Sequence, residues 1–592
     1  MKRETTVEKK KENKNFLVLG IHDGHNAAAA LLKNGKIITA IQEERISRVK
    51  NQWGIPYNAI QEILKITGIK LSDIDFVALN GFYMSYDHWE KRALIENYKE
   101  RTSLKGKIKR ILKQFKLINK TYHRFLQQKR LSLISELGIP INKIIPVEHH
   151  LAHTAAAYYG WGKYRDKEVL IITCDGGGDG LCATVNIGYQ GNIKRIAQIF
   201  WEDSLGSLYS NVTFFLGMMP LEHEYKVMGL APYAGNSKDV ERVYRKFLNM
   251  FVISNKDPLR WRRAKGIPPM PYILNFLKKE LEFERFDWIA AGIQKCIETI
   301  LTTWIRNCIQ ETGIRRIALS GGVFMNVKVN KAIMELPEVE DLFIFPSCGD
   351  ETNAIGAAYW VYAQEKIKSG SSINIEPIGP IYWGGTFEDD EIEEAIKNYH
   401  FSSKVSVSFE DNIERKIAKL LAKGEIVARA KGEMEFGARA LGNRSILANP
   451  SNPKIIRVIN EMIKCRDFWM PFAPSILDTR VKDYLKKPKE IPAPYMILAF
   501  DSKLEKFEKF SAAAHPYDYT IRPQEVFEEY NSDYYKLLKY FEELTGEGII
   551  LNTSFNLHGY PIVYTPEDAL QVFDQSGLRY LALGNFLLQK VK

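Results

Sequence analysis

Two histidines separated by four positions, His149 and His153, are the residues of this sequence whose type and spacing most directly suggest chemistry. On an α-helix this spacing places both imidazoles on one face, within reach of a single metal ion. The surrounding stretch favours a helix, because it is rich in alanine and contains no proline. A pair of buried structural histidines is the alternative, since short motifs of this kind also arise by chance.

A metal held by two histidines alone would be bound weakly, so carboxylate ligands are expected from elsewhere in the chain. Asp175 and Asp350 are the candidates, because each follows a strand-like stretch and lies in a turn that contains glycine. Imidazoles combined with carboxylates suit iron, zinc or manganese. The predicted metal ligands are therefore His149, His153, Asp175 and Asp350.

The elements that must position these ligands form an internal repeat. A buried strand from residue 16 ends at Asp23 and is followed by a hairpin over 27–42; the same pattern returns over 168–200, with Asp175 at the corresponding turn. A helix is expected over 286–312, followed by a strand and a glycine turn at 316–326. Duplicated units of this kind predict an α/β fold of the actin-like class, which includes sugar kinases and Hsp70.

The length of 592 residues exceeds what one ordinary core accommodates, so at least two domains are expected. The stretch from Ser369 to Pro380 has the composition of a linker. The sequence predicts a disordered tail over 1–14, an actin-like domain over 15–375 with a basic helical insertion at about 90–137, and a second domain over 376–592 of mixed α+β structure.

Arginines and glycines are concentrated in one stretch of the second domain. Arg439 and Arg444 stand beside Gly437 and Gly442, and Ser445 follows directly. Guanidinium groups next to flexible backbone suit a phosphate or oxyanion site. Surface ion pairs are the alternative for any single arginine.

The net charge of +11 is unevenly distributed, since residues 101–130 contain eleven Lys or Arg and no Asp or Glu. The apolar residues of this segment recur at helical spacing, which fits either a helix on an anionic membrane or a solvated cap helix. No apolar run is long enough to span a bilayer, and the charged start of the chain lacks the apolar core of a signal peptide. The six cysteines contain no CxxC pair, so reduced, inert thiols in a cytoplasmic protein are expected.

Several blocks, in order along the chain, resemble the O-carbamoyltransferases, the family of NodU and of enzymes that modify cephamycin and aminoglycoside antibiotics. The blocks begin at Glu43 (Glu-Glu-Arg-Ile-Ser-Arg), His149 (His-His-Leu-Ala-His), Glu224 (Glu-Tyr-Lys-Val-Met-Gly), Ser320 (Ser-Gly-Gly-Val-Phe-Met-Asn), Met434 (Met-Glu-Phe-Gly-Ala-Arg) and Leu551 (Leu-Asn-Thr-Ser-Phe-Asn). Together they cover the chain from about residue 16 to 588.

The resemblance implies two coupled sites. A C-terminal domain similar to YrdC-type proteins would make carbamoyl-adenylate from carbamoyl phosphate and ATP with Mg²⁺, and an N-terminal domain similar to the threonylcarbamoyl-tRNA metal-binding protein would transfer the carbamoyl group to an acceptor hydroxyl. The implied catalytic residues are His25 as general base, Arg439, Lys464 and Arg466. The implied adenylate-binding residues are Lys226, Gly229, Ser320, Gly321, Gly322 and Asn326. The implied carbamoyl phosphate and ATP site comprises Arg439, Arg444, Ser445, Lys464, Arg466, Arg522, Asn552 and Ser554.

The resemblance favours iron as the metal, with zinc and manganese as alternatives, and a small hydroxyl acceptor such as a saccharide, an antibiotic or a lipid-linked glycan. No nucleic acid partner is expected. A peripheral membrane contact through residues 101–130 and a homodimer are left open. A threonylcarbamoyl-type tRNA-modifying enzyme, an actin-like kinase and a non-enzymatic membrane-associated binding protein are the rival interpretations.

The sequence departs from the family pattern at three places. Asn26 and Ala27 follow His25 where Asp and Ser are usual, Met470 stands where an arginine is expected, and Tyr560 replaces a glutamate. None of these positions is one of the predicted site residues. These departures are expected to affect how the protein binds the acceptor and the phosphate groups.

Overall fold

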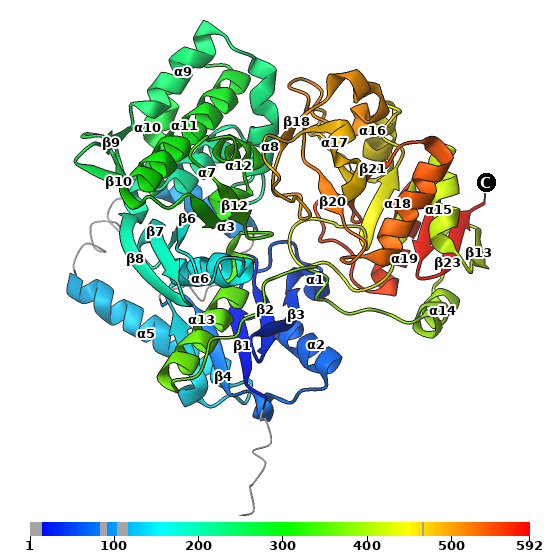
Figure 1. Ribbon diagram of the computed structural model, residues 1–592, viewed down its shortest axis with the longest axis horizontal. Coiled ribbons are helices and arrows are strands. Elements are labelled where there is room, and N and C mark those ends of the chain that lie inside the picture. Colours follow the sequence, from blue (N-terminus) through cyan, green and yellow to red (C-terminus); the bar gives the residue numbers. More distant parts are fainter. Residues whose placement is uncertain (1–14, 83–90, 104–115, 465–466, 592) are drawn as a thin grey trace, which may run out of the picture.

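The computed structural model describes residues 15–82, 91–103, 116–464 and 467–591, so the tail predicted over 1–14 lies outside the described residues. The chain forms two lobes, drawn from blue to green and from yellow to red in Figure 1. Between Lys368 and Asp389 there is no helix or strand, only an isolated bridge between Tyr382 and Glu435. This extended stretch coincides with the linker that the sequence predicted.

The first sheet of the N-terminal lobe has the order β3-β2-β1-β4-β5. Strands β1, β2 and β3 pair antiparallel, whereas β4 and β5 continue from β1 in parallel. Every residue of β1 is buried, as expected for a strand covered on both faces. The strands are β1 (Leu17–His22), β2 (Ala28–Lys33), β3 (Lys36–Gln42), β4 (Phe76–Asn80) and β5 (Ile144–Val147).

The second sheet repeats this topology with the order β12-β11-β6-β7-β8. Strands β6, β7 and β8 again form an antiparallel meander, and β11 and β12 extend it in parallel from β6. The duplication predicted from the sequence is therefore present in the topology. The strands are β6 (Val169–Gly178), β7 (Leu181–Tyr189), β8 (Asn192–Phe200), β11 (Arg316–Ser320) and β12 (Asp341–Ile344), with a separate hairpin of β9 (Phe251–Ser254) and β10 (Asp257–Arg263).

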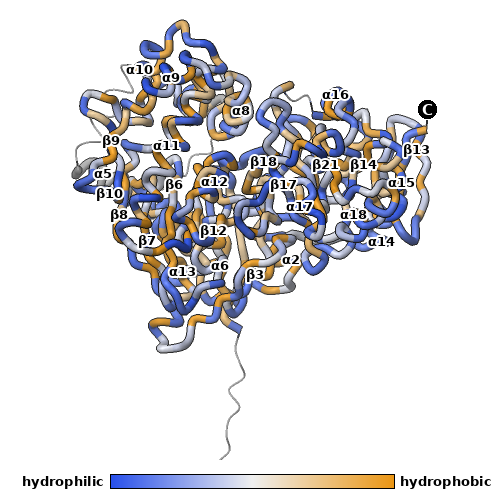
Figure 2. The backbone as a smooth tube through the Cα atoms, turned by 45° about the horizontal axis from the view of Figure 1, so that its top comes forward, coloured by the Kyte–Doolittle hydropathy of each residue, from blue (hydrophilic) through white to orange (hydrophobic). Residues whose placement is uncertain are grey.

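Helices pack on these two sheets and, together with the strands, supply the large hydrophobic core. The helix predicted over 286–312 is confirmed as α11. Figure 2 shows hydrophobic and hydrophilic residues alternating along peripheral helices such as α9, as expected for elements with one face in the core. The helices of this lobe are α1 (Glu44–Ser47), α2 (Tyr57–Thr67), α3 (Lys91–Arg101), α5 (Lys116–Ser135), α6 (His149–Trp161), α7 (Leu205–Phe215), α8 (Glu224–Leu230), α9 (Lys238–Leu248), α10 (Leu274–Glu280), α11 (Phe286–Thr312), α12 (Val327–Met334) and α13 (Asn353–Lys368).

Helices α6 and α13 cross in close contact between the two sheets. A Cβ atom built on Gly356 of α13 would lie 1.9 Å from the carbonyl oxygen of Ala152 on α6. Glycine at this position therefore allows the two backbones to approach, and the N-terminal ends of both helices come together. Those two ends carry three of the four predicted metal ligands, namely His149, His153 and Asp350.

The C-terminal lobe is built on an eight-stranded sheet with the order β13-β23-β22-β14-β15-β21-β16-β20, beside a small sheet β17-β18-β19. Its helices cover both faces of the larger sheet and bury two further hydrophobic clusters. The strands are β13 (Val405–Phe409), β14 (Val427–Ala430), β15 (Arg444–Ala448), β16 (Ala473–Leu477), β17 (Leu485–Lys486), β18 (Phe500–Ser502), β19 (Thr520–Ile521), β20 (Gln524–Val526), β21 (Ile549–Ser554), β22 (Tyr580–Leu583) and β23 (Phe586–Lys590). The helices are α14 (Asp389–Asn398), α15 (Ile413–Ala422), α16 (Ile455–Ile459), α17 (Val481–Tyr484), α18 (Ser532–Thr545) and α19 (Pro566–Gln575).

The basic segment 101–130 falls partly outside the described residues, because 104–115 are not described. In its described part, Phe125 on α5 is 63% exposed, whereas Arg130 on the same helix is buried. Among the residues that the structure describes, no helix is both long and apolar enough to cross a membrane. The five described cysteines are buried and form no disulfide.

Candidate active site

Helix α6 begins at His149 because its first backbone N–H groups find side-chain acceptors. The carboxylate of Glu148 accepts from the N–H groups of His150 and Leu151, and Asp179 accepts from His149 N at 2.8 Å. The helix start is thus fixed, and the four-residue spacing places the rings of His149 and His153 4.9 Å apart between centroids.

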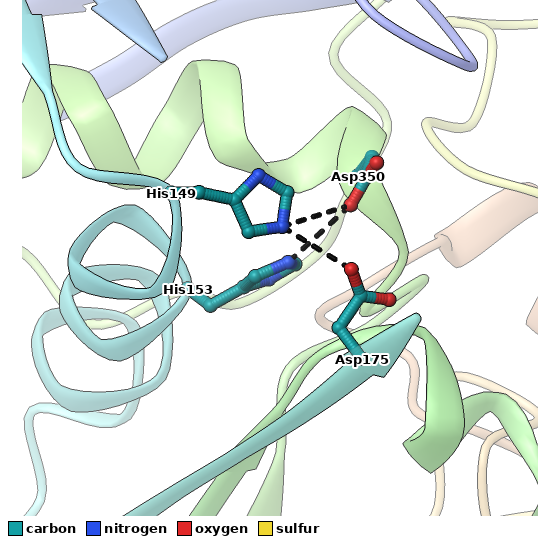
Figure 3. A group of neighbouring side chains, drawn as sticks. All are labelled: His149, His153, Asp175 and Asp350. Atoms are coloured by element: carbon teal, nitrogen blue, oxygen red, sulfur yellow. Dashed lines mark hydrogen bonds and ion pairs between the residues drawn. The ribbon is translucent and has the colours of Figure 1, made fainter. Parts of the chain in front are cut away.

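Two carboxylates meet these imidazoles from the neighbouring elements, as Figure 3 shows. Asp175 of β6 places Oδ2 3.2 Å from His149 Nε2. Asp350, in the turn that leads into α13, places Oδ1 3.4 Å from Nε2 of both histidines. One ligand atom from each of these residues lies within 4.8 Å of the other three. The four ligands predicted from the sequence therefore come together in the fold.

The chemistry of this donor set fits a divalent cation. Asp350 Oδ1 is buried, and its nearest donors are the two imidazole nitrogens at 3.4 Å, a distance at which a cation between these three atoms would satisfy all of them. His153 Nδ1 lies 3.2 Å from the hydroxyl of Ser320, the kind of outer contact that orients a metal-binding imidazole. A mixed imidazole and carboxylate set with a side open to a cavity suits catalytic zinc, iron or manganese.

The charges of the four side chains in the cluster are also compatible with a bound cation. Burial lowers the pKa of the His149 imidazole, but the carboxylates of Asp350 and Asp175 outweigh burial and raise it to about 10. Burial by itself raises the pKa of Asp175, yet the neighbouring imidazoles bring it below its usual range. Without a metal, the protonated His149 would therefore supply the positive charge that the two carboxylates favour, and a bound cation would take its place.

His25, the predicted general base, lies just beyond β1 and lines the same cavity as Asp175 and Asp350. Its carbonyl oxygen accepts from Nε2 of the buried His22 at 2.9 Å, and its ring meets Trp53 edge-on at 5.3 Å between centroids. Burial lowers the pKa of His25 below its ordinary value, so the ring is neutral at neutral pH. A neutral imidazole is the form that accepts a proton.

A cavity of about 620 Å³ extends from this cluster to the C-terminal lobe. Its walls come from both lobes, so one continuous space adjoins residues of the cluster and residues of the C-terminal lobe. Of the predicted site residues, those that line it are His25, Asp175, Lys226, Gly229, Gly322, Asn326, Asp350, Arg439, Lys464, Arg522 and Ser554.

The C-terminal wall of the cavity carries a buried ammonium group. Lys464 is 2% exposed and donates to the backbone carbonyl of Ser554 and, at 2.7 Å, to Oδ1 of Asn556. These acceptors fix the direction of the side chain without neutralising its charge. With Arg439 and Arg522 on the same wall, the cavity presents cationic groups suited to a polyanion.

Two of the adenylate-binding residues predicted on the N-terminal side, Lys226 and Gly229, lie at the seam between the lobes. Lys226 forms an ion pair with Asp467 at 2.9 Å, and the carbonyl of Gly229 accepts from His515 Nε2 at 2.9 Å. Met470, one of the departures from the family pattern, lies over Gly229, since a Cβ atom there would be 3.1 Å from its sulfur. The C-terminal lobe thus covers helix α8 directly.

Five residues that were predicted to bind the adenylate, carbamoyl phosphate or ATP do not line the cavity. Arg444 is buried at the start of β15, where it donates to the backbone carbonyls of Tyr564 and Gly432 at 3.1 and 2.9 Å. Ser445 accepts from Gly442 N at 3.0 Å.

The other three residues, Asn552, Ser320 and Gly321, are also parts of the scaffold. Asn552 donates to Ser475 and Gln524. Ser320 and Gly321 lie behind the cavity wall, Ser320 against His153 and Gly321 against the backbone of Cys174. Arg466 lies outside the described residues.

Several cavity residues were not among the predicted sites, namely Gln42, Glu44, Arg45, Glu351 and Asn556. Arg45 is the clearest signal missed, because it stands in the block that begins at Glu43 and is 1% exposed. Asn556 follows Ser554 within the block at Leu551. Both residues stand in blocks that can be recognised in the sequence, but only the fold shows that they line the same cavity.

Fold and site together define a two-lobed α/β protein in which a cluster of candidate metal ligands and a cationic wall adjoin one cavity. The family model described as "Carbamoyltransferase N-terminus" matches residues 17–359, and "Carbamoyltransferase C-terminus" matches residues 418–590. The chain belongs to the carbamoyltransferase family, and the sequence-based prediction of that family and of a carbamoyltransferase enzyme is confirmed.

Relatives match along nearly the full chain. The protein MJ1051 of Methanocaldococcus jannaschii is 33% identical over 97% of this chain and 100% of its own length. Nodulation protein NolNO of Sinorhizobium fredii is 29% identical over 96% of this chain and 79% of its own length. A crystal structure of full-length HypF in the phosphate- and nucleotide-bound form has a TM-score of 0.32 and 16% identity, covering 62% of this chain and 57% of that chain, a likeness too low to define the fold.

Proposed function

We propose that this protein is an ATP-dependent O-carbamoyltransferase in which the C-terminal lobe makes carbamoyl-adenylate and the N-terminal lobe transfers the carbamoyl group to an acceptor hydroxyl. The observation that carries the proposal is one cavity whose lining includes Asp175 and Asp350, the carboxylates of the cluster, together with Lys464, Arg439 and Arg522. A carbamoyl-adenylate is hydrolytically labile, so placing both sites in one cavity would shorten its exposure to bulk water.

At the C-terminal end, the cationic wall would bind carbamoyl phosphate and the phosphates of ATP. Formation of carbamoyl-adenylate requires the phosphoryl group of carbamoyl phosphate to leave as inorganic phosphate with consumption of water, after which the carbamate oxygen attacks the α-phosphorus and pyrophosphate leaves. Lys464 and Arg439 would hold the transferring oxygens and stabilise the charge that develops on them. ATP would enter with Mg²⁺.

At the N-terminal end, His25 would accept the proton of the acceptor hydroxyl as that oxygen attacks the carbamoyl carbon, and AMP would leave. Lys226, Gly229, Gly322 and Asn326 would hold the adenylate along the seam. When bound by the four ligands, the metal supplies Lewis-acid polarisation of the carbamoyl carbonyl. The resemblance favours iron over zinc or manganese for this site.

The N-terminal lobe contributes both aromatic and polar side chains to the cavity, including Trp53, Trp201, Tyr98, Glu222 and Arg101. Aromatic faces beside hydrogen-bonding groups suit a hydroxylated acceptor such as a saccharide, an antibiotic or a lipid-linked glycan. We further propose an actin-like N-terminal domain over 15–375, a YrdC-like C-terminal domain over 376–592 and a cytoplasmic location, where ATP and carbamoyl phosphate are made.

The purified protein is expected to release pyrophosphate from ATP only when carbamoyl phosphate is present, because the C-terminal wall would have no other carbamoyl donor. Coupled detection of pyrophosphate with and without carbamoyl phosphate measures this directly. If the rate of pyrophosphate release does not depend on carbamoyl phosphate, the proposal is excluded. A requirement for threonine and bicarbonate instead would indicate the threonylcarbamoyl-type reaction.

Replacing Lys464 by methionine is expected to lower this pyrophosphate release by about 10²- to 10³-fold, the usual effect of removing one preorganised charge-stabilising group. Methionine keeps the length of the side chain but removes the charge that Ser554 and Asn556 direct into the cavity. A Lys464→Arg variant, which keeps the charge, serves as the control and should retain more activity. Equal rates for the methionine variant and the wild type would exclude a role for Lys464.

A further inference from the structure

The loop that carries Arg439 is held by side chains of the N-terminal lobe. The backbone N–H of Gly437 donates to Gln42 Oε1 at 3.1 Å, and that of Ala438 donates to Ser347 Oγ at 2.9 Å. The guanidinium of Arg45 donates to the carbonyl of Gly437. Both residues that precede Arg439 are therefore fixed from the other lobe.

These contacts are buried and tightly packed. Gln42, Arg45 and Ser347 are 3%, 1% and 4% exposed. Gly437 has a φ of +97°, and a Cβ atom there would lie 2.4 Å from Cβ of Ser347. Because hydrogen bonds strengthen where water is excluded, this loop has one well-defined position relative to the N-terminal lobe.

The contacts also join the two reaction sites. Ser347 lies three residues before Asp350, and its hydroxyl donates to the carboxylate of Glu351 while accepting from Ala438. The turn that supplies a metal ligand is thus in direct contact with the loop that supplies a cationic group to the cavity wall.

We propose that Gln42, Arg45 and Ser347 are positioning residues for Arg439, so that the carbamoyl-activating site of the C-terminal lobe is completed by the N-terminal lobe. This inference rests on the proposed function. A guanidinium that binds a phosphoryl or carboxyl oxygen must be placed within a fraction of an ångström, and misplacement by about 1 Å costs about 10²-fold in rate. Changes in the N-terminal lobe will therefore impair the first half-reaction.

The decisive variant is Gln42→Leu, because it removes the acceptor for Gly437 N and lies outside the turn that carries Asp350. We expect the KM for carbamoyl phosphate in pyrophosphate release to rise about tenfold, with a smaller change in kcat. Gln42→Glu keeps an oxygen acceptor at the same place and is expected to restore the wild-type KM to within about threefold. A role in folding alone would change the amount of active protein but not KM.

Thr39→Val is the matched control. The Thr39 hydroxyl donates across the same seam to the carbonyl of Trp383 at 2.8 Å, and Ala40 N also donates to that carbonyl, so the acceptor stays paired in the variant. This variant is expected to keep the wild-type KM. Metal content should be unchanged in both variants.

The outcomes separate this inference from the proposed function. If the wild type releases pyrophosphate in response to carbamoyl phosphate but Gln42→Leu has the same KM, or Thr39→Val raises KM equally, the inference is overturned and the proposed function stands. If the wild type shows no such response, the proposed function fails. In that case, calorimetry with pyrophosphate as the probe still decides the inference, which requires weaker binding by Gln42→Leu than by the wild type or Thr39→Val.

Discussion

Replacing His149 by alanine is expected to abolish carbamoyl transfer to the acceptor while leaving carbamoyl phosphate-dependent pyrophosphate release intact. His149 Nε2 is the atom shared by both carboxylates, at 3.2 Å from Asp175 and 3.4 Å from Asp350. Removing it should lower metal affinity at least about 100-fold, since replacement of an outer-shell partner alone costs up to about that much. The cationic wall around Lys464 does not include this side chain, so the first half-reaction should proceed.

Metal analysis, acceptor carbamoylation and pyrophosphate release together test this prediction. His150→Asn is the matched control, because His150 is buried on the same helix turn but bonds Thr173 Oγ1 at 2.8 Å and is not a member of the cluster. Asparagine offers a polar group close to the position of Nδ1, so this variant should keep its metal and transfer activity. Loss of pyrophosphate release together with transfer in His149→Ala would contradict the separation of the two sites.

The sequence predicted those features that depend on local periodicity. The pair His149 and His153 was visible because helix geometry alone places residues i and i+4 together. Helix 286–312 was predicted to its ends, since its apolar residues recur at helical spacing and Gly313 ends it in the left-handed conformation. The duplicated hairpins were recognised because each Asp-Gly turn falls at the same point of the repeat, and the two sheets share one topology.

The sequence could not distinguish arginines that face the cavity from those that face the scaffold. Arg439 and Arg444 lie five residues apart in one glycine-rich stretch, yet only Arg439 lines the cavity. A guanidinium has five donors, which backbone carbonyls can satisfy as well as an anion, and Arg444 uses Tyr564 and Gly432 in this way. Whether the guanidinium binds an anion or backbone carbonyls depends on where β15 begins, and no local sequence pattern specifies that position.

Contacts between distant residues were also beyond prediction. Arg45 meets Gly437 across 392 positions, and Arg130 meets Asp23 across 107. Both arginines were visible as charges in the sequence, and Arg130 was counted in a basic segment whose charge suggested a solvated surface or a membrane contact. Its burial shows that the end of this segment is part of the N-terminal core.

Replacing Arg130 by methionine is expected to destabilise the N-terminal lobe by about 3–5 kcal/mol, the usual cost of breaking a buried ion pair. Arg130 and Asp23 are 1% and 2% exposed and form a bidentate pair, with Nε 2.6 Å from Oδ2 and Nη2 2.5 Å from Oδ1. The same guanidinium donates to the carbonyls of Asn80 and Gly81 at the end of β4. Methionine fills most of the space but leaves the Asp23 carboxylate buried without its cation.

The double variant Arg130→Met with Asp23→Asn separates the charge from the packing. Because it leaves no unpaired buried charge, it should recover a large part of the lost stability, measured as the urea midpoint of the N-terminal unfolding transition. Equal destabilisation of the single and double variants would show instead that the carbonyl contacts or packing dominate. Any deletion within the basic segment 101–130 that tests a membrane contact must therefore keep Arg130 in place.

The ion pair of Arg130 on helix α5 with Asp23 also lies close to the proposed general base, because Asp23 is two residues before His25. If Arg130 holds the turn after β1 in place, transfer should fall in Arg130→Met below the unfolding temperature, while pyrophosphate release in the C-terminal lobe keeps its wild-type KM for carbamoyl phosphate. Transfer measured against release in the same preparation distinguishes this from simple loss of folded protein, which would lower both in proportion. A proportional loss would confine Arg130 to stability alone.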